Sequence, residues 1–330
     1  MNAIWTDMIT PNDWGFKKQL ELETKEKWVV ENRVANGSSK NFLNKFFNVY
    51  IRYFGFALNK FFSRKKYDKV ISWQQFFGII FAFYCLIFKI KKYPKIYIIG
   101  LNYKEKRGYL GKIYYKFMKV TLESKYVYKI IVETSQEVTK YSRCFSINDK
   151  IFYCLGGIDN IKKIEKSEKG KYYLSVGRTN RDYNFLINCF KVLSDESLII
   201  ICDKLNLKSS KNVSILRNVF DAEYEKYLSN SFALILSLGD DNVSSGQLSA
   251  MHAMMYKKPI IVTKNTCLND CLFDNINCIV IDKKIESLKS ALLRLENDPS
   301  FYNFITENAY SYFINNFTID SFGKRLGKLI

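Results

Sequence analysis

Cationic and hydroxyl side chains follow two apolar runs in the second half of the chain. Arg178 and Arg181 come after residues 172–176, and the Ser-Ser-Gly segment 244–246 follows residues 232–238. A helix that begins after such a strand offers free backbone N–H groups and the positive end of its dipole, which bind phosphate. Arginine adds bidentate contacts to the same anion. We therefore predict an anion-binding site at the carboxyl ends of these strands, where parallel sheets bind ligands.

Alternating strands and helices must position these residues in the second half. The predicted strands cover residues 172–176, 197–202, 213–216, 232–238, 260–263 and 277–281. The predicted helices cover residues 183–193, 221–229 with Asp221 as N-cap, 248–255, 285–295, 301–313 and 318 onwards. This alternation is typical of an α/β domain built on a parallel sheet.

The first half shows the same alternation less regularly. Its predicted strands are 69–72, 95–100, 129–133 and 150–155, and its predicted helices are 19–34, 42–62, 76–90, 112–122 and one from Thr134 to about 145. The aromatic and basic helix 42–62 either lies on a bilayer or packs in a core. The apolar segment 76–90 falls short of the roughly 20 residues that span a bilayer, which favours a buried helix or an interfacial segment.

The charged segment 161–170 is the predicted linker between domains 1–160 and 161–330.

The composition is that of a globular protein with an uneven charge. The 330 residues are 48% hydrophobic and 25% charged, with a net charge of +19. Residues 1–165 carry 30 Lys/Arg against 14 Asp/Glu, whereas residues 166–330 carry 21 against 18. The first half is thus expected to meet a membrane surface, a lipid phosphate or a nucleic acid, unless the lysines reflect only a compositional bias. A nucleic acid is the least favoured, because no reader motif accompanies the charge.

The cysteines and the N-terminus indicate a reducing compartment. Eight cysteines show no CxxC pairing, and several lie in apolar runs, which is typical of buried free thiols. Zinc is not expected, since His252 is the only histidine. Asp7, Pro11 and Asp13 interrupt any apolar core of a signal peptide. A cytoplasmic protein is predicted.

The order of these features resembles the GT-B glycosyltransferases, specifically the retaining family-4 type of bacterial capsule and exopolysaccharide biosynthesis. The resemblance covers the second half and, more weakly, residues 67–160. It is carried by YYLSVGRTNRDYNFLINCF, by LIIICDKL with NVSILRNVFDAEYEKYLSNSFALILSL, by SSGQLSAMHAMMYKKPIIVT, and by NDCLFDNINCIVI. It implies an α/β fold of two Rossmann-like domains facing a cleft, with the C-terminal helix crossing back to the first domain.

The resemblance also implies an activity. The chain would move a hexosyl-type sugar from a nucleotide-diphosphate donor to a lipid-linked saccharide or other surface-polysaccharide acceptor, with retention and without a metal or cofactor. Its partners would be the donor, the acceptor and an anionic membrane surface, with no nucleic acid, at the inner face of the cell membrane. The expected donor-binding residues are Arg178, Arg181, Lys204, Asn218, Asp240, Asp241, Ser244, Ser245, Gly246, Gln247 and His252. The expected acceptor-side residues are Lys104, Lys106 and Arg107.

One departure from the family pattern bears on activity. The family has two glutamates eight positions apart around the phosphate-binding helix, and Ser244 and His252 stand at those positions. A carboxylate accepts two hydroxyl hydrogen bonds, whereas a neutral imidazole accepts one. The alternative is therefore a non-catalytic glycosyltransferase-like partner subunit at the membrane. Glu133 and Glu137 lie near the expected acceptor side, but nothing in the sequence marks either as a base, so no catalytic side chain is assigned.

Overall fold

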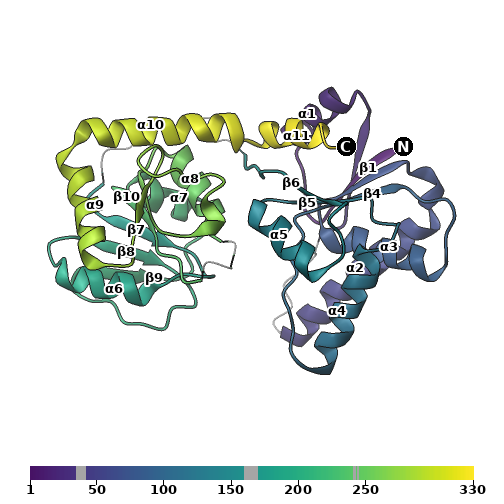
Figure 1. Cartoon of the computed structure of the whole chain (residues 1–330), viewed down its shortest axis with the longest axis horizontal. Coiled ribbons are helices and arrows are strands. Elements are labelled where there is room, and N and C mark those ends of the chain that lie inside the picture. The colour runs from purple at the N-terminus through teal and green to yellow at the C-terminus, as the bar shows by residue number, and fades with distance from the viewer. Residues whose placement is uncertain (35–41, 160–169, 241–242, 244) are drawn as a thin grey trace. The chain divides into compact units, whose positions relative to one another are not determined.

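The computed structural model describes residues 1–34, 42–159, 170–240, 243 and 245–330, without the side chains of residues 42–48 and 267. The chain forms two compact units, Met1–Gly156 with Asp320–Ile330, and Gly157–Ile319. The predicted linker 161–170, apart from Gly170, and the predicted boundary after residue 160 lie outside the described residues. Both units are α/β structures (Figure 1).

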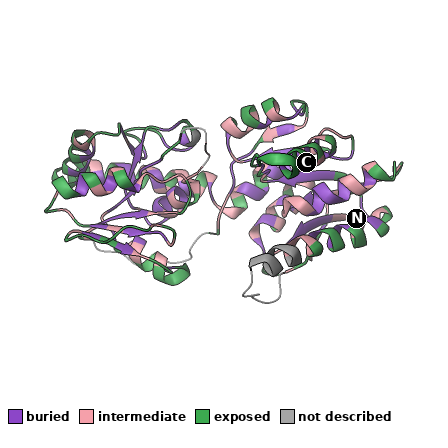
Figure 2. Ribbon diagram, turned by 90° about the horizontal axis from the view of Figure 1, so that it is seen from below, coloured by how far each residue is buried: buried purple, intermediate pink, exposed green. Residues whose placement is uncertain are grey.

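The first unit is built on a six-stranded parallel sheet in the order β2-β1-β3-β4-β5-β6. Its strands are β1 (Asn2–Thr6), β2 (Trp28–Asn32), β3 (Lys69–Ser72), β4 (Lys95–Ile99), β5 (Lys129–Val132) and β6 (Ile151–Tyr153). The central strands are buried on both faces, as parallel strands covered by helices must be (Figure 2). The predicted helix 19–34 was correct only as far as Thr24, because residues 28–32 form strand β2, and β1 was not predicted at all.

Helices cover both faces of this sheet. They are α1 (Gly15–Thr24), α2 (Phe42–Phe62), α3 (Gln75–Ile87), α4 (Gly108–Leu122), α5 (Ser135–Cys144) and α11 (Ile319–Gly327), with a short 3₁₀ turn at Arg64–Lys66. Helices α2, α3 and α4 lie on one face, and α1 and α11 lie on the other (Figure 1). Thr134 caps α5 as predicted, since its hydroxyl accepts a hydrogen bond from the Glu137 N–H.

The C-terminal helix returns to the first unit, as predicted. Its Phe322 ring lies 5.3 Å from that of Phe16 on α1, and Gly323 lies directly against the Phe16 backbone. A Cβ at position 323 would come within 2.5 Å of the Phe16 carbonyl oxygen, so only glycine permits this contact.

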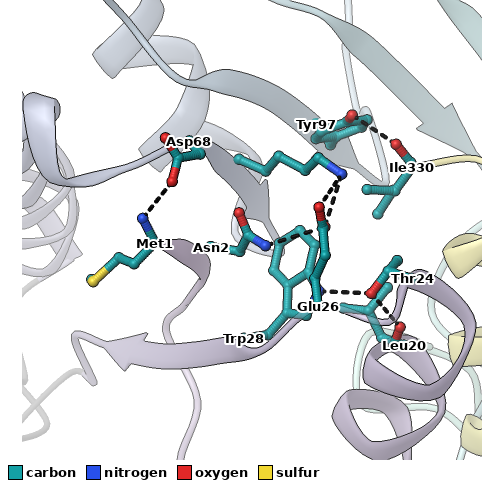
Figure 3. A network of polar contacts seen from close by, with 10 residues as sticks. Met1, Asn2, Leu20, Thr24, Glu26, Trp28, Asp68, Tyr97 and Ile330 are labelled. Carbon is teal, nitrogen blue, oxygen red and sulfur yellow. Dashed lines mark hydrogen bonds and ion pairs between the residues drawn. The ribbon is translucent and has the colours of Figure 1, made fainter.

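A polar network at the amino ends of the first sheet fixes the chain end (Figure 3). Glu26 accepts hydrogen bonds from Asn2 and Lys69, at 3.2 and 2.8 Å, which ties the start of β2 to β1 and β3. The Tyr97 hydroxyl on β4 donates to the carbonyl of Ile330 at 3.1 Å. The last residue is thereby held at the sheet by strand β4.

The second unit has its own six-stranded parallel sheet, in the order β12-β11-β10-β7-β8-β9. Its strands are β7 (Tyr173–Val176), β8 (Leu198–Ile201), β9 (Val213–Leu216), β10 (Ala233–Leu236), β11 (Ile260–Thr263) and β12 (Ile279–Ile281). The chain runs outward from β7 to β9 and then returns to β10 on the other side of β7. The strand order therefore reverses between β7 and β10, and in such sheets ligands bind at the carboxyl ends of the strands beside the reversal.

The helices of the second unit are α6 (Tyr183–Val192), α7 (Asp221–Ser229), α8 (Gln247–Met255), α9 (Ile285–Asn297) and α10 (Pro299–Asn316), with a 3₁₀ turn at Thr266–Leu268. Helices α6 and α9 bury their apolar sides in a core with the sheet, and α8 packs against β10, β11 and α10. The predicted cap of α7 was wrong. Asp221 is the first helical residue, with a φ of +46°, and Phe220 occupies the N-cap position without a side-chain hydrogen bond.

Candidate functional site

A cavity of about 290 Å³ lies at the carboxyl ends of β7 and β8, beside the start of α7 and one side of α8. It belongs entirely to the second unit. Its walls mix apolar, aromatic, cationic, carboxylate and imidazole groups. They are formed by Val176, Gly177, Arg178, Ile201, Cys202, Asp203, Val219, Phe220, Asp221, Tyr224, Leu248, Ser249 and His252.

Arg178 brings the positive charge to this cavity from the turn after β7. Its guanidinium forms an ion pair with Asp203 at 2.6 Å and lies 5.4 Å from the centre of the Phe220 ring. The side chain is 51% exposed, so its remaining N–H groups are open to an anion. Arg178 was predicted to bind phosphate, and its position in the cavity wall is compatible with that role.

Asp203 is itself held by the backbone after β9. Its Oδ1 atom accepts a hydrogen bond of 2.8 Å from the N–H of Asn218. Asn218 has a φ of +58°, which aims that N–H at the carboxylate, and its exposed side chain is not part of the cavity wall. The following residues, Val219 and Phe220, do line the cavity.

His252 lies on the cavity side of α8. Its Nδ1 atom is 3.3 Å from the Tyr224 hydroxyl of α7, and the two rings lie 5.5 Å apart. Burial lowers the pKa of His252, because the protonated ring would lose its hydration, and the Glu225 carboxylate opposes this only in part. A neutral imidazole therefore stands where the family pattern has a carboxylate.

Arg181 has a different environment from Arg178. Its guanidinium donates to the carbonyls of Val176 and Thr179, at 2.9 and 3.0 Å, and to the hydroxyls of Ser245 and Ser249, at 3.3 and 3.4 Å. It does not line the cavity. Burial lowers the pKa of Arg181, because the charged guanidinium loses hydration, but an arginine stays protonated at neutral pH. Arg181 thus joins the turn after β7 to the start of α8.

The start of α8 is shaped by a glycine. Gly246 is the N-cap residue with a φ of +95°, a conformation that L side chains rarely adopt, and Gln247 is the first helical residue. Ser245, immediately before, accepts the hydrogen bond from Arg181. The predicted donor-binding residues Asp241 and Ser244 lie outside the described residues.

Two further predicted residues lie away from the cavity. Lys204 is exposed next to Asp203 and is not in the cavity wall. Asp240 is exposed on the loop after β10, where its N–H donates to the Asn180 Oδ1 atom at 2.6 Å and its carbonyl accepts from Asn180 Nδ2 at 2.8 Å. It lines a separate hollow of about 620 Å³ with Gly239, Lys264, Asn265, Thr266, Asp282 and Lys283.

The predicted acceptor-side residues lie in the first unit. Lys104, Lys106 and Arg107 are exposed in the loop between β4 and α4, and Lys106 lies 4.4 Å from the centre of the Tyr114 ring. Glu133 and Glu137 follow β5. Burial raises the pKa of both carboxyl groups, and the charge of Glu137 adds to the effect on Glu133.

Sequence reasoning singled out Arg178 and His252 and missed other residues of the cavity wall, among them Asp203, Tyr224 and Ser249. Asp203 directly follows the predicted strand 197–202, so its position at a strand end was a usable signal. Tyr224 and Ser249 gave none, because each lies on a helix whose cavity-facing side is set by tertiary packing. Across the residues that the structure describes, no group of three or more His, Cys, Asp and Glu side chains could hold a metal ion. Within the same residues, every helix is too short or too polar to cross a bilayer.

Comparison with known proteins relates the whole chain to solved structures. No protein-family model and no curated protein sequence matches it. HepE of Anabaena, in complex with UDP-glucose, superposes with a TM-score of 0.67 at 10% identity over 100% of this chain and 99% of that one. Sucrose-phosphate synthase of Thermosynechococcus elongatus gives 0.67 at 12% identity, covering 99% and 97% of the two chains. WaaG, a glycosyltransferase involved in lipopolysaccharide biosynthesis, gives 0.62 at 12% identity, covering 100% and 99%. The chain therefore has the fold of these structures, which is the GT-B fold, as predicted.

Proposed function

We propose that the second unit binds a nucleotide-diphosphate sugar and that the chain transfers the sugar to an acceptor. The observation that carries this proposal is the cavity at the carboxyl ends of β7 and β8, which combines Arg178, Phe220 and His252. It lies beside the point where the strand order of the sheet reverses. The likeness to HepE, whose structure holds UDP-glucose, supports a donor of this class.

Each cavity group has a role in this proposal. The Phe220 ring is 48% exposed and offers an apolar face on which a nucleobase can stack. Neutral His252 accepts one hydrogen bond from a ribose hydroxyl. Arg178 and the N-terminus of α8 stabilise the negative charge that grows on the diphosphate as the sugar leaves. Arg181 supports the last role by fixing Ser245, next to the helix start.

The reaction we propose is hexosyl transfer with retention. No side chain is assigned as a nucleophile, because the donor phosphate can take the acceptor proton itself. Arginine and the helix dipole supply the charge stabilisation that a metal ion gives in other transferases, so no metal is assigned. Asp241 and Ser244 remain proposed donor ligands on the family resemblance alone. Lys204 and Asp240 are proposed on that resemblance and their place after strands β8 and β10, and Gln247 on that resemblance and its place at the start of α8.

The acceptor we propose is a lipid-linked saccharide at an anionic membrane surface on the inner side of the cell membrane. Lys104, Lys106 and Arg107 support this, since an exposed basic loop after β4 can hold a lipid-linked phosphate. The excess of 30 basic over 14 acidic residues in positions 1–165 supports an anionic partner for the first unit.

A thermal-shift panel of UDP-, GDP- and CMP-linked compounds tests the donor proposal. A ligand that binds only the folded state raises the melting temperature, so we expect a rise with one nucleotide class. Mass spectrometry of nucleotide that co-purifies with the protein would name that class directly. An intact fold with no response to any of the nucleotides would refute the proposed activity.

The second candidate is a non-catalytic partner subunit. It is favoured by His252, which accepts fewer hydrogen bonds than the carboxylate that the family pattern has there. The two candidates differ in one measurement. A partner subunit raises the turnover of another transferase and transfers no sugar by itself. The enzyme transfers sugar from donor to acceptor with no other protein present.

A further inference from the structure

The outward face of α2 is apolar. Ile51, Phe54, Leu58 and Phe62 are 65%, 40%, 38% and 74% exposed. Their spacing places them within an arc of about 80° on a helix. A surface helix of a globular protein normally turns charged and polar residues to this side. Four large apolar side chains in one stripe are therefore an unusual surface, and they indicate a partner.

This stripe is not a core face that has turned outward. The other side of α2 is already packed, since Tyr53, Phe56, Ala57 and Phe61 are buried in the core of the first unit. The Phe56 ring stacks on Phe77 of α3 with centroids 4.1 Å apart. Rotating the stripe inward would expose these contacts, so α2 carries a second apolar side in addition to its core-facing side.

The apolar surface continues onto the end of α3. Phe88 lies 5.3 Å from Phe61, ring centre to ring centre, so the ends of α2 and α3 are neighbours. Ile87 and Phe88 are 53% and 59% exposed. The exposed apolar residues of α2 and of the end of α3 together form a surface that we call the α2–α3 patch. It comprises Ile51, Phe54, Leu58, Phe62, Ile87 and Phe88.

Lysines follow both helices at this end. Residues 49–104 contain eleven Lys or Arg and one acidic residue, Asp68. Five exposed lysines come directly after the two helix ends, and among the described residues none of the five forms an ion pair. They are Lys65, Lys66, Lys89, Lys91 and Lys92.

We propose that the α2–α3 patch and these five lysines dock the first unit on an anionic lipid surface. The patch enters the boundary between headgroups and acyl chains, and the lysines reach the lipid phosphates. A bilayer fits both features at once, because a protein partner would have to present a large apolar surface ringed by acid. This inference makes the proposed membrane partner specific, and it is independent of donor binding.

Flotation of the full-length protein with vesicles tests the proposal. We expect binding to phosphatidylcholine vesicles that contain phosphatidylglycerol, and little binding to phosphatidylcholine alone. Phe54→Ser with Phe62→Ser should weaken the binding at least about tenfold, because two aromatic rings that would enter the bilayer are lost. Lys65→Gln with Lys66→Gln should weaken it by about tenfold at low salt and by less at high salt, because salt screens these charges.

Matched variants in the second unit are the controls. Leu293→Ser with Phe304→Ser removes two apolar side chains of similar exposure, 44% and 52%, and should leave vesicle binding unchanged. Lys208→Gln with Lys211→Gln removes two exposed positive charges from the second unit and should likewise leave vesicle binding unchanged. Circular dichroism shows that each variant is folded, and a nucleotide thermal shift that the Phe54 and Phe62 variant retains shows that donor binding is separate.

Two measurements can overturn the proposal. In flotation, the proposal fails if wild-type protein does not float with anionic vesicles or if the Phe54 and Phe62 variant floats as wild type does. In solution, it fails if wild type is a dimer that this variant converts to a monomer without any effect of lipid, because the patch would then be a protein interface.

Discussion

Arg178 and Asp203 form an ion pair of 2.6 Å in the cavity wall, between the turns that follow β7 and β8. The pair adds little to stability, because the Arg178 side chain is 51% exposed and water screens its charge. The pair instead fixes the position of the Arg178 guanidinium. Asp203 is anchored by the Asn218 N–H at 2.8 Å, so the carboxylate holds the guanidinium at the cavity.

Replacement of Arg178 by alanine should weaken binding of the nucleotide diphosphate by about 10- to 100-fold, the usual effect of losing a hydrogen bond to a charged group. Isothermal titration calorimetry with the nucleotide identified by thermal shift measures this. Lys208→Ala removes an equal charge from an exposed position outside the cavity and should change the affinity by less than about twofold. Unchanged affinity in the Arg178 variant would show that the phosphates bind elsewhere.

Asp203→Asn tests whether the carboxylate orients Arg178 or competes with the ligand. If it orients the guanidinium, the variant should bind nucleotide about three- to tenfold more weakly, since a neutral amide holds the guanidinium less tightly than a carboxylate does. The double variant with Arg178→Ala should then bind no more weakly than Arg178→Ala alone, because the two side chains act as one unit. Tighter binding by Asp203→Asn would instead mean that Asp203 occupies the phosphate position on Arg178.

The second unit was predictable from the sequence almost throughout. Its strands are apolar runs bounded by polar turns, as in segment 232–238, and each lies within a predicted range. The first unit was harder at its N-terminus. Strand β1 was missed although it is five residues long and largely buried. Strand β2 ends in Glu31 and Asn32 and lies at the edge of the sheet, so it lacks the apolar run of a central strand.

The cavity was predictable only in part. Arg178 and His252 could be found because one follows a strand and the other aligns with a family position. Arg181 looks equivalent to Arg178 in the sequence, yet its hydrogen bonds to Val176 and Ser245 turn it away from the cavity. Such a difference depends on where the start of α8 lies relative to β7, and residue type does not encode that.

His252 should titrate below its ordinary value of 6.5, because burial lowers its pKa. It is the only histidine, so a single imidazole resonance in the NMR spectrum reports its protonation. Between 6.5 and the lower folded-state pKa the unfolded chain binds more protons, so the free energy of unfolding should fall as the pH falls through this window. The affinity for the donor should fall as the pH approaches the folded-state pKa of His252, because protonation removes the hydrogen-bond acceptor of the ring. His252→Gln should lack both changes, and a resonance that titrates at or above 6.5 would contradict the prediction.

Gly246 and Gly55 form a matched pair for backbone strain. A Cβ meets no atom closer than 3.5 Å at Gly246 and nothing within 4 Å at Gly55, so neither alanine variant is crowded. Gly246 has a φ of +95°, however, so Gly246→Ala should destabilise the second unit by about 1–2 kcal/mol. Gly55 is inside helix α2, and Gly55→Ala should stabilise the first unit by up to about 1 kcal/mol.

Tryptophan fluorescence and circular dichroism distinguish the two units. All four tryptophans, Trp5, Trp14, Trp28 and Trp73, lie in the first unit, so their fluorescence follows the unfolding of that unit, whereas far-ultraviolet circular dichroism follows both units. Gly246→Ala should lower the transition seen by circular dichroism more than the one seen by fluorescence. Equal stability of Gly246→Ala and wild type would show that the start of α8 adopts another conformation in solution.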